Sequence, residues 1–135
     1  MRKKVGMAVC AVLIVLFAVL SFWPQPVVSD VAQYEIQRVT YYEDGQPEEI
    51  TDRVDLVQLK ALLAGAQCSR MAQTRGSYSL DEVAFEIDGV CAGQPLHIIL
   101  GDFNEVYVSA DEGNFEIRDG AALLAQVKAL AGVEE

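Results

Sequence analysis

An uncharged stretch near the N-terminus constrains this chain more than any other feature. From Val5 to Trp23 no side chain carries a charge. A helix over this stretch would be about 28 Å long at 1.5 Å per residue, which is close to the ~30 Å hydrocarbon core of a bilayer. Pro24 and Pro26 follow at once and end the helix. The sequence therefore predicts a membrane-inserting segment within residues 1–26.

The residues that flank this segment predict its orientation. Arg2, Lys3 and Lys4 form a basic cluster in front of it, and such clusters stay on the cytoplasmic side of a membrane. Trp23 stands where an interfacial aromatic residue is expected. We therefore expect a single-pass protein of the cell membrane, with its N-terminus inside and its C-terminal domain outside.

Two interpretations of the segment remain open. It is either a permanent anchor or a signal peptide, in which case the chain is secreted after cleavage near Ser29. The three residues before Asp30 are Val-Val-Ser, which is not the A-x-A type, and the apolar run exceeds the usual signal core of about 7–15 residues. The sequence favours the anchor.

The chain beyond Trp23 is strongly acidic. It holds seven basic and all twenty acidic residues, a net charge of −13. Nucleic acid, anionic lipid headgroups and envelope polyanions repel such a surface. The charge therefore argues against nucleic-acid binding and is compatible with a basic partner or a bound cation, although it also serves solubility alone.

Two cysteines, Cys68 and Cys91, lie outside the apolar segment. In an exported domain they are a candidate disulfide, which would stabilise by roughly 3 kcal/mol on the chain-entropy model. Two buried free thiols are the alternative. A zinc site is not indicated, because there is no C-x-x-C pair and His97 is the single histidine.

Alternating apolar residues predict an antiparallel sheet. In the first strand, residues 33–42, we expect one side to carry Tyr34, Ile36, Arg38, Thr40 and Tyr42 and the other Val39 and Tyr41. An Asp-Gly turn leads to an edge strand over residues 47–50. Further strands are expected over residues 66–73 (with Cys68 inward), 82–88, 95–100, 105–109 and 115–117.

Two stretches show helical periodicity. The first begins at a cap formed by Thr51 or Asp52 and ends at Gly65, and the second begins at Asp119 and ends at Gly132. Their apolar stripes are Leu56, Leu59, Leu62 and Leu63, and Leu123, Leu124, Val127, Leu130 and Ala131.

The order of these elements predicts an α+β domain, a mainly antiparallel β-meander packed against two helices. We expect it to cover residues 33–132, joined by a tether of residues 27–32 to the membrane anchor or signal segment of residues 1–26.

No motif in the chain marks an active site. His97 lies in a strand with no G-x-S-x-G or H-E-x-x-H pattern around it. Acidic turns, such as the one with Asp102 and Glu105, lack the pattern of a calcium loop. We therefore assign no catalytic, cofactor-binding or metal-binding residue. Tyr41 and Tyr42 could form part of a binding surface.

The basic start, the apolar segment and the stretches ITDRVDLVQLKALLAG, LHIILGDFNEVYV and FEIRDGAALLAQVKAL resemble small exported, membrane-anchored bacterial proteins of uncharacterised function. The resemblance is one of topology and implies an extracytoplasmic domain. We expect a non-enzymatic module that binds a protein or a cell-envelope component. The alternatives are an inhibitor or immunity-type protein at the membrane, and a small carboxylate- or cation-dependent hydrolase.

Overall fold

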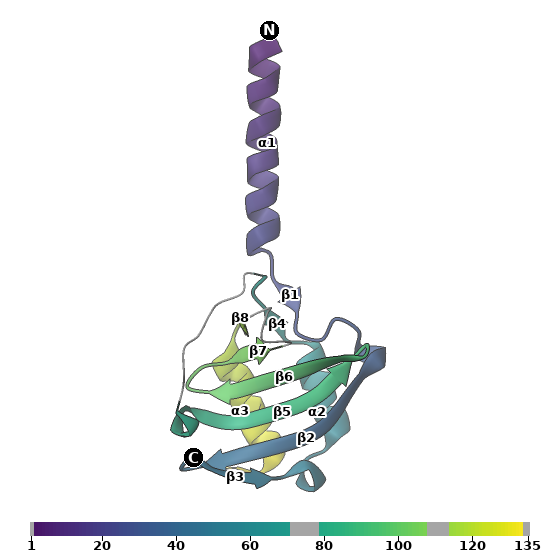
Figure 1. Cartoon of the computed structure of the whole chain (residues 1–135), viewed down its shortest axis with the longest axis vertical. Coiled ribbons are helices and arrows are strands. Elements are labelled where there is room, and N and C mark those ends of the chain that lie inside the picture. Colours follow the sequence, from purple (N-terminus) through teal and green to yellow (C-terminus); the bar gives the residue numbers. More distant parts are fainter. Residues whose placement is uncertain (1, 71–78, 108–113, 134–135) are drawn as a thin grey trace.

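The chain forms a layer of β-sheet with two helices against one face and a long helix that projects from one end (Figure 1). This computed structural model describes residues 2–70, 79–107 and 114–133. Helices and an antiparallel sheet share the fold, which confirms the predicted α+β class.

The projecting helix α1 (Arg2–Phe22) contains the uncharged stretch. Of the described helices, it alone is long and apolar enough to cross a membrane or to act as a signal sequence. Its described side chains are almost all exposed, as expected for a helix that does not pack on the domain.

The main sheet has six strands in the order β3-β2-β5-β6-β7-β8, and every neighbouring pair is antiparallel. The strands are β2 (Tyr34–Glu43), β3 (Gln46–Glu49), β5 (Val83–Cys91), β6 (Gln94–Gly101), β7 (Glu105–Tyr107) and β8 (Asn114–Glu116). The predicted strand over residues 105–109 extends beyond the described residues. In β5, the alternation of Val83, Phe85 and Ile87 inward is confirmed.

The predicted sidedness of β2 is wrong in its first half. A register shift between Ile36 and Arg38 breaks the alternation, as an extra residue in a β-bulge does. Tyr34 and Ile36 therefore share the core face with Val39. Nothing in the local sequence marks the extra residue, so period-two counting could not find it.

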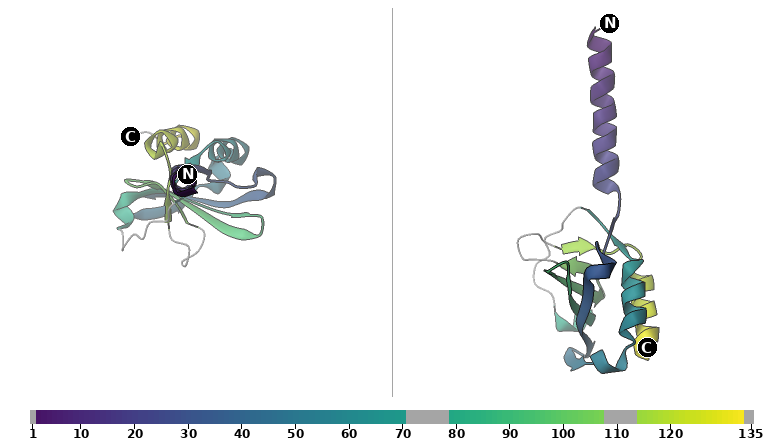
Figure 2. Two further views of the ribbon diagram at one scale, coloured as in Figure 1. Left: turned by 90° about the horizontal axis from the view of Figure 1, so that it is seen from above. Right: turned by 90° about the vertical axis from the view of Figure 1, so that its right-hand side faces the viewer.

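Helices α2 (Leu56–Ala64) and α3 (Gly120–Ala131) lie side by side on one face of the sheet (Figure 2). Their predicted stripes face inward. Leu59, Leu63, Leu123 and Val127 are buried, and Leu56, Leu62, Leu124, Leu130 and Ala131 pack at the margin of the core. No helix or strand among the described residues covers the opposite face, which we call the open face.

The first helix starts later than predicted. Residues Thr51–Arg53 form a short 3-10 turn, η2, and Asp55 caps α2 by accepting from the amides of residues 57 and 58. The Thr51 hydroxyl instead accepts from the amide of Val39 at 3.0 Å. It therefore satisfies a donor of β2 and is unavailable as a helix cap.

The second helix begins after Asp119, as predicted, but Asp119 does not cap it. Its backbone is left-handed (φ 51°) and its side chain makes no capping hydrogen bond. Gly120 follows in close packing, because a Cβ there would lie 2.5 Å from that of Asn104. Gly132 ends the helix in the left-handed region (φ 72°), as expected.

The end of the predicted anchor or signal segment and the start of the predicted tether are part of the domain. A second, two-stranded sheet joins β1 (Gln25–Pro26) to β4 (Gln67–Cys68), and the amide of Val27 donates to the carbonyl of Ala66 at 3.0 Å. Val27 and Val28 are 5% and 2% exposed and belong to the core. The residues directly after the apolar helix are therefore fixed in the fold. Two 3-10 turns, η1 (Val31–Gln33) and η3 (Leu80–Glu82), precede β2 and β5.

Candidate functional site

The strand register aligns two rows of side chains on the open face. Residues paired across antiparallel strands lie directly opposite one another, with their side chains about 4.5–5.5 Å apart. The first row runs across β2, β5, β6, β7 and β8 as Arg38, Asp88, His97, Tyr107 and Asn114. The second runs as Thr40, Glu86, Ile99, Glu105 and Glu116.

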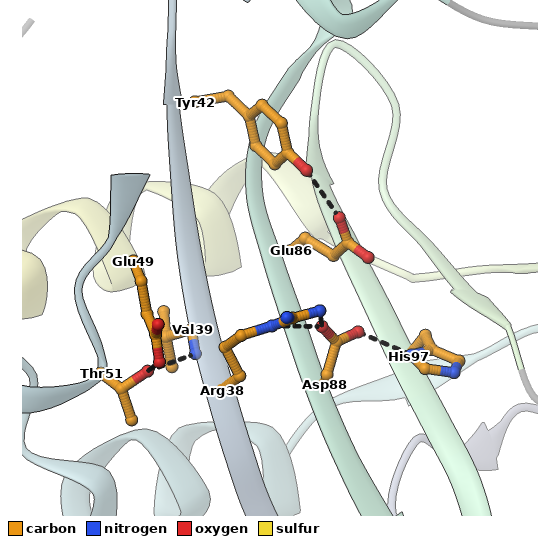
Figure 3. A network of polar contacts seen from close by, with 8 residues as sticks. All are labelled: Arg38, Val39, Tyr42, Glu49, Thr51, Glu86, Asp88 and His97. Carbon is orange, nitrogen blue, oxygen red and sulfur yellow. Dashed lines mark hydrogen bonds and ion pairs between the residues drawn. The ribbon is translucent and has the colours of Figure 1, made fainter. Parts of the chain in front are cut away.

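In the first row, Asp88 lies between Arg38 and His97 and contacts both (Figure 3). Its Oδ2 accepts from the Nε of Arg38 at 3.2 Å and from the Nη2 at 2.9 Å. Its Oδ1 lies 2.6 Å from Nδ1 of His97. The Asp88 side chain is only 11% exposed, whereas that of Arg38 is 57% exposed. A nearly buried carboxylate is thus held between two partly exposed basic groups.

This arrangement fixes the orientation of the histidine ring. Asp88 accepts the Nδ1 proton, so in the neutral ring Nε2 is left as a hydrogen-bond acceptor. The hydrogen bond to Asp88 raises the pKa of the Arg38 guanidinium, which remains positively charged. The charge of Asp88 is therefore balanced without a ligand, and His97 is preorganised.

A cavity of about 260 Å³ lies beside this network. It is lined by Glu86, His97, Ile99, Tyr107 and Asn114. The rings of His97 and Tyr107 lie 5.8 Å apart with a tilt of 36°, and Glu86 accepts from the Tyr42 hydroxyl at 2.9 Å. The cavity thus combines a carboxylate, an aromatic ring and an imidazole nitrogen.

The cavity lining carries groups that can bind a cation. A histidine–aspartate pair activates a nucleophile when a serine, threonine or cysteine lies within hydrogen-bond reach. None of the described residues that line this cavity is of those types. A carboxylate next to an aromatic face instead attracts an organic cation.

Asp102 and Glu105, from one of the acidic turns, line a second, larger cleft of about 800 Å³ near the start of α3. Asp102 is exposed. Glu105 is only 2% exposed, and its carboxylate accepts from the side-chain amide of Asn114 at 2.9 Å. Among the described residues, no group of three or more histidine, cysteine, aspartate or glutamate side chains is placed to hold a metal ion.

The predicted disulfide between Cys68 and Cys91 is not seen, and both residues are buried free thiols. Each has its own neighbours. Cys68 pairs with Gln25 on β1, whereas the Cys91 thiol donates to the carbonyl of Asp30 at 3.4 Å. Both line one cavity of about 340 Å³, whose wall also includes Gln25, Pro26, Val27 and Ser29.

The residues predicted to set membrane topology lie at the two ends of α1. Arg2, Lys3 and Lys4 are exposed in its first turn. Trp23 directly follows its last residue and is 61% exposed. These positions are compatible with a membrane helix whose basic residues lie at one interface and whose tryptophan lies at the other.

The sequence places Arg38, Asp88 and His97 in three separate strands and does not connect them. The strand register connects these three residues, and this register could not be read from the alternation alone. Comparison of the chain with protein-family models, curated proteins and solved structures found no match.

Proposed function

We propose that this chain is a membrane-anchored, non-enzymatic binding module outside the cytoplasm, and that its open face binds a basic side chain of a protein partner. The observation that carries the proposal is the preorganised cavity beside Asp88 and His97, with Glu86 and Tyr107 in its wall. Its binding groups are held in place by neighbouring strands, so binding would order few side chains.

Charge supports a basic protein and argues against an envelope polyanion. The domain after Trp23 carries −13, and Glu86 contributes a carboxylate to the cavity itself. A lysine or arginine side chain would approach along a favourable field and meet the aromatic ring of Tyr107.

Retention of the anchor is the second part of the proposal. Cleavage near Ser29 would remove β1 and also Val27 and Val28, which lie in the core. Burial of a valine side chain stabilises by about 1.5–3 kcal/mol, and a domain has about 5–15 kcal/mol in total. A chain cut at this point would lose a large share of its stability. Arg2, Lys3 and Lys4 would keep the N-terminus inside.

The binding claim can be tested on the full chain in phospholipid nanodiscs. His97 is the only histidine, so its ring protons in an NMR spectrum report on this cavity. Acetyl-arginine amide is titrated in, and acetyl-citrulline amide serves as the uncharged control of nearly the same shape. We expect the His97 signals to shift with the arginine compound and much less with the citrulline compound.

A matched pair of variants locates the effect. Glu86→Gln removes the charge but still accepts from the Tyr42 hydroxyl, and should abolish most of the shift. Asp52→Asn removes an exposed carboxylate from η2 and should leave it unchanged. Equal responses to both compounds, or to both variants, would contradict the proposal.

A small carboxylate-dependent hydrolase is the second candidate, because Asp102 and Glu105 line one cleft. It would require a hydrolytic activity that Asp102→Asn removes while the fold, measured by circular dichroism, stays intact.

A further inference from the structure

We infer that the domain stands directly on the membrane on its β1–β4 end, against the phospholipid headgroups, with the open face turned sideways along the bilayer surface. The inference depends on the proposed retention of α1. It adds a second interaction surface, with lipid, to the proposed binding face.

The connection between helix and domain is too short for a free tether. Helix α1 ends at Phe22 and β1 begins at Gln25. The chain between these two residues spans at most about 10 Å at 3.3–3.6 Å per residue. The headgroup layer on each side of a bilayer is about 5–8 Å thick. Strand β1 therefore cannot lie far beyond the headgroups when α1 is inserted.

Hydrogen bonds also restrict this connection. The Trp23 amide continues the helix by donating to the carbonyl of Val19 at 2.9 Å. Its own carbonyl accepts from the Nε of Arg70 at 3.0 Å, and Gln25 Nε2 donates to the carbonyl of Ser69 at 3.0 Å. Pro24 has a fixed φ. The junction is therefore held by the helix on one side and by the residues after β4 on the other.

The side chains at this end suit an interface with lipid. Trp23 is 61% exposed and Arg70 is exposed, and these are residue types that favour the headgroup region. An acidic stretch lies at the opposite end of the domain. Residues 43–55 contain six acidic residues and one basic residue, and β3, which lies within this stretch, is at the end of the domain away from α1 (Figure 1).

The sheet lies beyond the end of α1, and its plane is roughly parallel to the helix axis, as the right-hand view of Figure 2 shows. With α1 across a bilayer, the sheet would be roughly perpendicular to the membrane. The open face would then be directed parallel to the membrane surface. The partner that fits this geometry is a protein that is itself in or on the same membrane.

Paramagnetic NMR on the full chain in phosphatidylcholine nanodiscs tests this arrangement. A small fraction of lipid carries a gadolinium chelate on its headgroup, which broadens nearby amide signals. We expect the amides of Gln67 and Arg70 to be broadened several-fold more than those of Gln46 and Glu49, at the opposite end of the domain. An insertion of eight glycine and serine residues between Trp23 and Pro24 should largely remove this difference.

Equal broadening at both ends, or an insertion without effect, would overturn the inference. The intact mass of the same protein extracted from membranes separates this outcome from failure of the premise. A mass that lacks residues 1–29 would overturn anchor retention and the inference with it. A full-length mass with equal broadening would overturn the inference alone.

Discussion

Val28 offers a direct test of whether the segment after the apolar helix belongs to the core. Val28→Ala removes two methyl groups from a site that is 2% exposed. At about 0.8 kcal/mol for each buried carbon, with a further contribution from the cavity that remains, we expect a loss of about 2 kcal/mol. Val31→Ala is the matched control, because Val31 is 42% exposed in the next turn of the chain. It should cost less than about 0.5 kcal/mol.

The two variants are compared by thermal unfolding of the full chain in detergent micelles. For a domain of this size, 2 kcal/mol corresponds to a fall in the melting temperature of about 8 °C. Near-ultraviolet circular dichroism of tyrosine follows the packing of the domain, because all five tyrosines lie outside α1. If Val28→Ala and Val31→Ala melt together, the segment contributes nothing to the core, and the stability argument against cleavage near Ser29 fails.

Four further tests address other parts of the fold. Gly89→Ala would place a methyl group 2.5 Å from a backbone oxygen of β2. We expect it to lower the free energy of unfolding, measured by urea titration, by about 3 kcal/mol. Gly65→Ala, where the nearest atom is 3.7 Å away, is the control and should be near neutral. Tyr34→Phe should stabilise by about 1 kcal/mol in the same assay, because the Tyr34 hydroxyl is buried without a hydrogen-bond partner among the described residues. Burial raises the pKa of the Cys68 thiol, so stability should fall as the pH rises above the ordinary thiol pKa, where the unfolded chain releases this proton first. Iodoacetamide should modify Cys68 and Cys91 only after unfolding, as followed by intact mass, and a native mass two hydrogens lower would instead reveal the disulfide.

The order of the elements could be predicted because it depends on local signals. Apolar residues at every second position mark β5, and Leu59 and Leu63 mark the buried side of α2. Gly132 ends α3 where expected because glycine adopts the left-handed conformation easily. Helix α2 also ends at Gly65, as predicted, although Gly65 keeps a right-handed backbone (φ −86°).

The features that define the candidate sites depend on contacts between distant segments. Arg38 meets Asp88 only because the chain gains a residue in β2, and His97 joins them through the register of β5 and β6. Strand β1 has only two residues, too few for any periodicity. Its existence depends on β4, about forty residues later in the chain, so the sequence alone placed these two residues at the end of the anchor or signal segment.

The small cavity can bind only weakly, and the fixed orientation of the domain at the membrane compensates for this weak affinity. A lysine or arginine residue of about ten heavy atoms, at about 0.3 kcal/mol per atom, gains about 3 kcal/mol, which corresponds to a dissociation constant of about 6 mM. Such a contact is negligible between freely diffusing proteins. When both partners are confined to one membrane and the binding face is directed parallel to its surface, the effective concentration of the partner rises toward the millimolar range. The cavity is then occupied for a substantial part of the time even though the contact is weak. The binding measured in nanodiscs with a soluble arginine compound should therefore be weak, on the order of several millimolar. A partner in the same bilayer should bind far better, and Glu86→Gln should weaken it as well.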